Sequence, residues 1–305
     1  MDGARSRSTR ASRYARRFGI AAWTVLGVTT PGCALLPEPW GGGPESIVGT
    51  VMLPFFFVLV VAQLICGIVD GRRRARGVLL AALVAWGVGS LHYSAASANH
   101  LTDTATPGVT YYVLAYTLIT VYLLTDVPRR GKLSLGIWLD AVIVAGGAAS
   151  LAGTLLLLTS TYSADPEDAG RMIALLYPMF DAMLAGLVIF QTATRIRPNA
   201  PMSRALVAAF LFLALSDAFL AHGIFQGMYQ RSPIVDVTCG IGLCLLAWAA
   251  CGARRPGIEG VRERSLDRVP ITASVGASFI GMLVVLSMPT VAQTSYVMVP
   301  ALLTV

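Results

Sequence analysis

Two aspartates stand inside long apolar stretches of this sequence, where ionisable side chains are rare. Asp181 follows Tyr177 by four residues in Tyr-Pro-Met-Phe-Asp, and Asp217 directly follows Ser216 in Leu-Ser-Asp. A charged side chain at membrane depth costs a few kcal/mol, so a residue of this kind is a candidate for function. We interpret the four residues as candidates for a ligand, ion or proton site. The alternative is helix packing, in which the carboxyls bond to neighbouring hydroxyls and freed backbone groups.

The three histidines form a second set of candidates. His92, His100 and His222 fall at or beyond the ends of apolar stretches, on the side expected to face outward, where a metal or pH-sensing site could form. Their spacing matches no HxH or HxxxH motif and the five cysteines form no CxxC pair, so no metal site is predicted. Walker A, GxSxG, HExxH and dinucleotide-binding motifs are also missing from the sequence. We therefore expect neither an enzyme nor a cofactor.

The elements that carry these residues are predicted to be membrane-spanning helices. Hydrophobic residues make up 55% of the 305 residues, charged residues only 13%, and the mean hydropathy is +0.69. A soluble domain needs more charge to cover its surface, whereas a chain that crosses lipid repeatedly needs apolar stretches of about 20 residues. The sequence predicts an all-α, polytopic transmembrane helix bundle with about nine spans and an incomplete tenth at 296–305. The spans are predicted at 18–36, 46–68, 77–95, 109–124, 135–158, 172–192, 205–225, 234–251 and 271–288.

The basic residues predict how these spans are oriented. All but Arg171 and Arg231 of the 23 lysines and arginines fall in alternate connections, as expected of loops that stay in the cytoplasm. The sequence therefore predicts a multi-pass protein of the bacterial cell membrane with a cytoplasmic N-terminus. For the same reason we interpret the net charge of +7 as a topology signal, so that the lipid bilayer and not nucleic acid is the expected partner. If 18–36 is instead a cleaved signal peptide, the later spans keep this orientation.

Weak internal similarity predicts a parallel four plus four repeat, with chance similarity between Leu- and Ala-rich segments as the alternative. Two pairs align at an offset of 126 residues and one at 124: Ser90 with Ser216, Pro107 with Pro233, and Pro54 with Pro178. The expected parts of the chain are a basic N-terminal segment (1–17), a first four-span unit (18–124), a second four-span unit (125–251), a basic cytoplasmic loop (252–270), and a ninth span with a truncated tenth (271–305).

Three short motifs occur in order in the second half of the chain. They are Leu-Asp-Ala at 139–141, Tyr-Pro-Met-Phe-Asp at 177–181 and Ser-Asp at 216–217. In this order they resemble the multi-span membrane modules that bacteria place before cytoplasmic GGDEF and EAL domains, which make and break cyclic di-GMP, and before some histidine kinases. The resemblance covers most of the chain from residue 77 onward. The catalytic motifs of those output domains are missing from this sequence.

The resemblance implies a membrane sensory or anchoring module, able to form a homodimer, that passes a signal to a cytoplasmic output domain not present in this chain. The ten residues 296–305 would cover about half of the hydrocarbon, so we expect the chain to be part of a longer protein. One alternative is a small-solute or ion transporter that uses intramembrane carboxylates, with helices broken at Pro54 and Pro178. The other is a membrane scaffold in which Asp181 and Asp217 serve packing alone.

Overall fold

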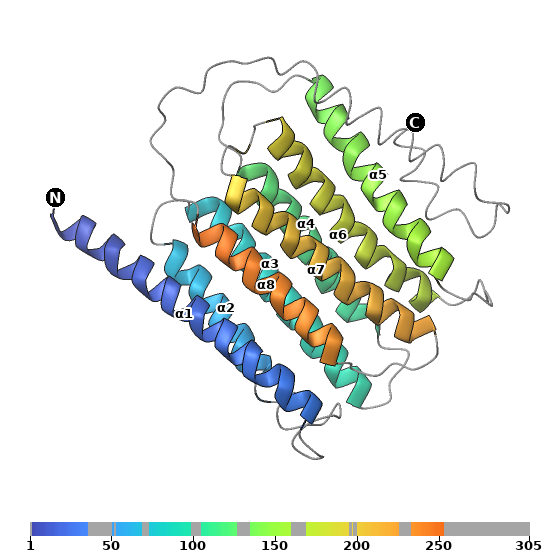
Figure 1. Ribbon diagram of the computed structural model, residues 1–305, viewed down its shortest axis with the longest axis horizontal. Helices are drawn as coiled ribbons and strands as arrows, with labels where there is room; N and C mark the ends of the chain where they lie inside the picture. The colour runs from blue at the N-terminus through green and yellow to red at the C-terminus, as the bar shows by residue number, and fades with distance from the viewer. Residues whose placement is uncertain are drawn as a thin grey trace. The chain divides into compact units, whose positions relative to one another are not determined.

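A computed structural model gives the fold of this chain (Figure 1). It describes residues 2–35, 51, 53–68, 73–98, 105–126, 135–159, 169–194, 197 and 200–252. Within these residues the chain forms eight helices and no strand. The helices are α1 (Asp2–Leu35), α2 (Leu53–Ile68), α3 (Arg73–Ala98), α4 (Ala105–Thr125), α5 (Leu135–Thr159), α6 (Ala169–Ala193), α7 (Ala200–Phe225) and α8 (Pro233–Gly252).

The helices group into two compact units that divide between Val127 and Pro128. Unit 1 contains α1 to α4, and unit 2 contains α5 to α8. Within each unit, every helix packs against the helix that follows it in the chain. Figure 1 shows that such neighbours run back along each other. Residues far apart in the sequence therefore meet at the same depth of neighbouring helices.

Four helices are long and apolar enough to cross a membrane, by length and composition. The qualifying segments are Arg74–His92 in α3, Leu176–Ala193 in α6, Pro201–Gly223 in α7 and Ile234–Gly252 in α8. Shorter apolar helical segments lie at Pro54–Ile68, Thr110–Thr125 and Leu139–Leu155. The predicted helical membrane protein is thus confirmed at this coarse level. The predicted ninth and tenth spans, and nearly all of the loop 252–270, lie outside the described residues, so the count of nine spans stays a prediction.

The helix surfaces are apolar, as expected for a protein surrounded by lipid. Each described helix exposes at least one large hydrophobic side chain, such as Trp23 on α1, Val84 on α3, Ile189 on α6 and Trp248 on α8. In a bilayer these side chains contact lipid tails, which are as apolar as the protein interior. The hydrophobic effect then gives helices little reason to associate, so close packing and interhelical hydrogen bonds must hold them together.

In unit 1, α1 contacts its neighbour through one narrow stripe of mostly small residues. Ala15, Ala22 and Leu26 are buried, and they recur at the spacing of one helix face. Between them, a Cβ placed on Gly19 would lie 3.0 Å from the side chain of Gln63 on α2. Small residues at such positions let two helices approach closely, which compensates for the weak hydrophobic drive in lipid.

Aromatic side chains fill the contact between α3 and α4. The ring of Trp86 on α3 lies 5.5 Å, centroid to centroid, from the rings of Tyr112 and Tyr116 on α4. The hydroxyls of Ser90 and Tyr112 lie 3.0 Å apart and form a hydrogen bond between the two helices. Edge-on and tilted aromatic pairs of this kind add to the stability that burial alone gives.

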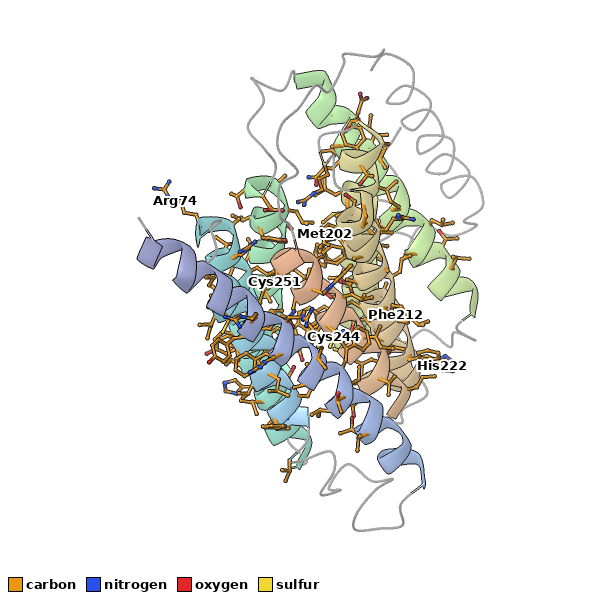
Figure 2. The ribbon with its side chains drawn as sticks, turned by 60° about the vertical axis from the view of Figure 1, so that its left-hand side comes forward. Arg74, Met202, Phe212, His222, Cys244 and Cys251 are labelled. Carbon is orange, nitrogen blue, oxygen red and sulfur yellow. The ribbon has the colours of Figure 1, made fainter. Side chains whose placement is uncertain are left out.

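In unit 2, α7 and α8 stay close along their whole length. Midway, a Cβ placed on Gly242 would lie 2.7 Å from Cγ of Leu213 and 3.0 Å from the carbonyl oxygen of Ala209. At the last turn of α8, a Cβ on Gly252 would lie 2.7 Å from the methyl carbon of Met202, whose position on α7 is labelled in Figure 2. Glycine at these two points lets the helices pack side chain against backbone.

Candidate functional site

Asp181 lies at the centre of α6 and is completely buried. Twelve residues separate position 181 from each end of the helix, which runs from 169 to 193. The carboxyl is therefore about 18 Å along the helix axis from either end. Its side chain is 0% exposed. A carboxylate at this depth of a membrane must be neutralised or bonded, because neither lipid nor apolar side chains solvate it.

Tyr177 lies one helical turn before Asp181 on the same buried face of α6. The face continues through Leu184 and Val188, both fully buried. Gly186 lies on another side of the helix, about 140° around the axis from Asp181, and packs on Ala148 and neighbouring residues of α5. Asp181 therefore faces away from the contact between α5 and α6.

Pro178 changes the backbone of α6 without breaking the helix. The helix is continuous from Ala169 to Ala193 with Pro178 inside it. Because proline has no N–H, the carbonyl of Ala174 loses its usual helical partner. Tyr177 and Asp181 lie about one and two turns after Ala174. Oη of Tyr177 and Oδ1 of Asp181 are buried atoms that make no hydrogen bond, although both residues make other contacts. A backbone carbonyl, a hydroxyl and a carboxyl thus lie within about two turns of a mostly apolar helix.

Ser216 and Asp217 lie at nearly the same depth on the neighbouring helix α7. Tyr177 lies 16 residues before the last residue of α6 (193), and Ser216 lies 16 residues after the first residue of α7 (200). Since these helices are antiparallel neighbours, the two residues are level to within about one turn. The hydroxyl of Ser216 donates to the carbonyl oxygen of Val235 on α8 at 3.0 Å. Ser216 therefore faces α8, and a pocket shared by Asp181 and Asp217 stays a prediction.

The two histidines that the structure describes lie in different units. His92, on α3 of unit 1, is exposed and stacks on Tyr111 of α4 with ring centroids 5.4 Å apart. His222, near the end of α7 in unit 2, is also exposed (Figure 2). His100 lies outside the described residues. Among the residues that are described, no group of three His, Cys, Asp or Glu side chains could hold a metal ion.

Two buried arginines make contacts that the sequence analysis did not predict. In unit 1, the guanidinium of Arg76 on α3 donates to the carbonyl oxygen of Gly67 in the last turn of α2. In unit 2, Arg197 donates from Nε to Oε1 of Gln191 at 2.6 Å and from its backbone N–H to the Gln191 carbonyl at 2.9 Å. Helix C-termini carry carbonyls without helical partners, so a cation there is favourable. We call these contacts the two arginine clasps.

The clasps fall at related positions of the sequence. Gly67 and Gln191 are 124 residues apart, the same offset that aligns Pro54 with Pro178. Charge pattern alone assigns both arginines to the topology signal, together with every other base of their connections. Only the acceptors share the offset, because Arg76 and Arg197 themselves are 121 residues apart.

No family model, curated protein or solved structure matches this chain. The candidate site is therefore defined by its own geometry. It consists of the fully buried carboxyl of Asp181 and the hydroxyl of Tyr177 one turn away. Ser216 and Asp217 on α7, level with Tyr177 to within about one turn, belong to it only as a prediction.

Proposed function

We propose that this chain is the membrane-embedded sensory module of a bacterial signalling protein, and that Asp181 is where the signal acts. The observation that carries the proposal is a carboxyl with 0% exposure at the middle of an apolar helix. Keeping such a group in lipid costs a few kcal/mol, which selection tolerates where the group has a use. The motif resemblance supplies the type of protein, and the buried carboxyl supplies the site.

A signal would act by changing the packing of α6. A ligand or proton shifts a conformational equilibrium only if it binds the two packings with different affinity. Asp181 lies ten residues before Gln191, about 15 Å along one rigid helix. Through Gln191 and Arg197, a displacement of α6 reaches the turn that leads into α7. The clasp of unit 2 is thus the first element beyond the helix to respond.

The proposal includes a particular arrangement in the membrane. The chain is a multi-pass protein of the cell membrane with about nine spans, a cytoplasmic N-terminus, and an output domain that follows on the cytoplasmic side. It has no enzymatic activity or cofactor of its own, does not bind nucleic acid, and acts as a homodimer. The distribution of the basic residues supports the orientation.

We also propose that the two units arose by duplication. Ser90 and Ser216, which align at the offset of 126, each make a hydrogen bond to the next helix of their own unit. Ser90 bonds to the hydroxyl of Tyr112 in unit 1, and Ser216 donates to the carbonyl oxygen of Val235 in unit 2. The common position of these bonds supports the duplication beyond the few aligned residues.

A transporter for a small solute or ion is the second candidate, because a buried carboxyl also suits ion translocation. Its predicted feature was a pair of helices broken at Pro54 and Pro178. α6 is instead continuous through Pro178, and Pro54 lies in the first turn of α2, where proline is tolerated. Continuous helices favour the sensory module.

Flux measurements separate the two candidates. The purified chain would be reconstituted into vesicles that enclose a pH-sensitive dye, and proton or cation gradients would be imposed. The sensory proposal expects no more flux than in protein-free vesicles. Gradient-driven flux that Asp181→Asn abolishes, and that the uncharged control Leu184→Met retains, would establish the transporter instead.

The signalling proposal has a direct genetic test. We expect the reading frame beyond the codon for Val305 to encode a further span and a cytoplasmic output domain. In that full-length protein, Asp181→Asn should abolish the response of the output domain to its signal without lowering the amount of protein in the membrane. A stop codon directly after Val305, or a normal response in the Asn variant, would contradict the proposal.

A further inference from the structure

The arginines at one end of unit 1 divide into a buried one and an exposed set. Arg76 is 5% exposed, and its guanidinium bonds to the end of α2. Arg74, only two residues earlier on α3, is exposed and points away from the helices (Figure 2). On α1, Arg16 and Arg17 are exposed as well. We refer to Arg16, Arg17 and Arg74 as the basic collar.

The members of the basic collar lie at one level of unit 1. Gly19 of α1 packs on Gln63 of α2, which fixes the register of these two helices. From that contact, Arg16 and Arg17 lie about 3 to 4.5 Å along α1, and Gly67 lies about 6 Å along α2 in the same direction. Because Arg76 binds Gly67, Arg74 lies within about one further turn of the same level. The three arginines therefore lie near the level at which α2 ends.

The exposed surface of α1 becomes apolar directly beyond the collar. Ile20 is 56% exposed, Trp23 40% and Val28 66%. In the proposed arrangement this part of α1 lies among lipid tails, which places Arg16 and Arg17 at the boundary where tails meet headgroups. Arginine reaches phosphate from such a position because its stem lies along apolar surface while its guanidinium reaches outward.

We propose that the basic collar binds the phosphates of anionic phospholipid headgroups. Each arginine near an anionic membrane surface raises the preference for charged lipid about fivefold, which corresponds to about 1 kcal/mol per charge. A soluble anion such as a nucleic acid fits the position less well, because the adjoining Ile20 and Trp23 would exclude it from half of the surface. The inference concerns unit 1 and is independent of any role of Asp181 in unit 2.

Trp23 is a natural reporter of the lipids beside the collar. The chain would be reconstituted in vesicles of phosphatidylcholine and phosphatidylglycerol, with bromine on the tails of one lipid or the other to quench nearby tryptophans. Subtracting the signal of Trp23→Phe isolates Trp23 from the other tryptophans. We expect phosphatidylglycerol to be enriched at least about fivefold around Trp23 at low salt, since each collar arginine contributes about that factor, and the enrichment to fall as salt screens the charges.

A pair of matched variants tests whether the collar is the cause. With Arg16, Arg17 and Arg74 changed to Gln, the enrichment should fall to about that of the bulk membrane; with the same residues changed to Lys, most of it should remain, because the charge is kept. Both variants leave the buried Arg76 intact, so the fold of unit 1 persists, and near-ultraviolet circular dichroism would verify this. Equal quenching by the two brominated lipids in the unaltered protein, or full enrichment in the Gln variant, would overturn the proposal.

Discussion

Under the proposed duplication, corresponding positions of α2 and α6 carry opposite kinds of side chain. Phe57 of α2 and Asp181 of α6 are 124 residues apart, the offset that aligns Pro54 with Pro178. In unit 1, the ring of Phe57 fills a notch over α3, so that a Cβ placed on Gly87 would lie 2.5 Å from it. In unit 2, position 181 is a buried carboxyl instead of a ring.

The helices that follow α2 and α6 in the chain also differ at aligned positions. At the offset of 126, Gly87 of α3 corresponds to Leu213 of α7. Leu213 packs on Gly242 of α8, where a Cβ placed on Gly242 would lie 2.7 Å from Cγ of Leu213. Unit 1 thus places an aromatic ring at this position, whereas unit 2 places a buried carboxyl there, although α6 packs closely on both α5 and α7. Under the proposed function, we interpret unit 1 as the structural unit and unit 2 as the functional unit.

Replacing the aromatic ring at position 57 by a carboxylate should have the largest effect on the free energy of unfolding. Phe57→Asp places a carboxyl in the apolar notch at Gly87, and we expect the free energy of unfolding to fall by about 3 kcal/mol, because apolar neighbours do not solvate a carboxylate. Unfolding of the purified protein in mixed micelles measures this. Phe57→Leu, which keeps the apolar character, should lose no more than about 1.5 kcal/mol. If the Asp variant is as stable as the Leu control, the notch is not the apolar contact described above.

The arginine clasps should matter to a similar degree in both units. Arg76→Gln and Arg197→Gln each remove a charged hydrogen bond, so we expect a loss of about 2 kcal/mol for each in the same unfolding assay. Arg74→Gln and Arg204→Gln, at exposed positions nearby, are the matched controls and should stay within about 0.5 kcal/mol. If one of the two Gln variants loses much stability and the other loses none, the two clasps are not equivalent.

Glycine substitutions should show whether the contact between α7 and α8 is tighter than the contact between α2 and α3. Gly242→Ala brings a Cβ against the backbone oxygen of Ala209, which cannot move aside, so we expect a loss of about 1 to 2 kcal/mol. Gly87→Ala meets only the far edge of the Phe57 ring, which can rotate, and should cost less. Gly27→Ala has no neighbour within 4 Å and serves as the control. Thermal unfolding of the three variants would measure these losses. A larger loss of stability for Gly87→Ala than for Gly242→Ala would show that the contact between α2 and α3 is the tighter one.

The two interhelical serines should have the smallest effects. Ser90→Ala and Ser216→Ala each remove one hydrogen bond between helices, which in membrane proteins contributes about 0.6 kcal/mol on average. We expect similar losses at both sites. A double-mutant cycle of Ser90→Ala with Tyr112→Phe would isolate the bond in unit 1, and a coupling energy of zero would show that the hydroxyl contact adds nothing.

Much of the fold follows from the sequence because lipid imposes simple rules. Apolar stretches predict helices. The bounds of the predicted spans 135–158 and 234–251 agree with those of α5 and α8 to within one residue. The predicted span 205–225 ends with α7, which begins five residues earlier. The basic segment 1–17 precedes the predicted span 18–36, and α1 runs through both from Asp2 to Leu35. Hydropathy marks where lipid begins, not where a helix begins, and the arginines and alanines of this segment favour helix.

The candidate site follows from the sequence only in part. Counting residues places Asp181 near the middle of its helix, as observed, but its role stays a prediction. The clasps could not be found by charge pattern, because Arg74 and Arg76 are both bases of one connection. Two residues of helix rotate the side chain by about 200°, so one arginine is exposed and the other is buried against α2. Only the packing of neighbouring helices distinguishes them.

The central claim is that Asp181 is retained for function and not for stability. Its most direct test is the free energy of unfolding of Asp181→Leu in mixed micelles, with Val188→Leu on the same buried face as an uncharged control. We expect Asp181→Leu to be more stable than the natural protein by about 1 kcal/mol or more, because an apolar side chain removes the penalty of the buried carboxyl. A loss of stability by a similar amount would show that the carboxyl holds the helices together, and would make this chain a scaffold.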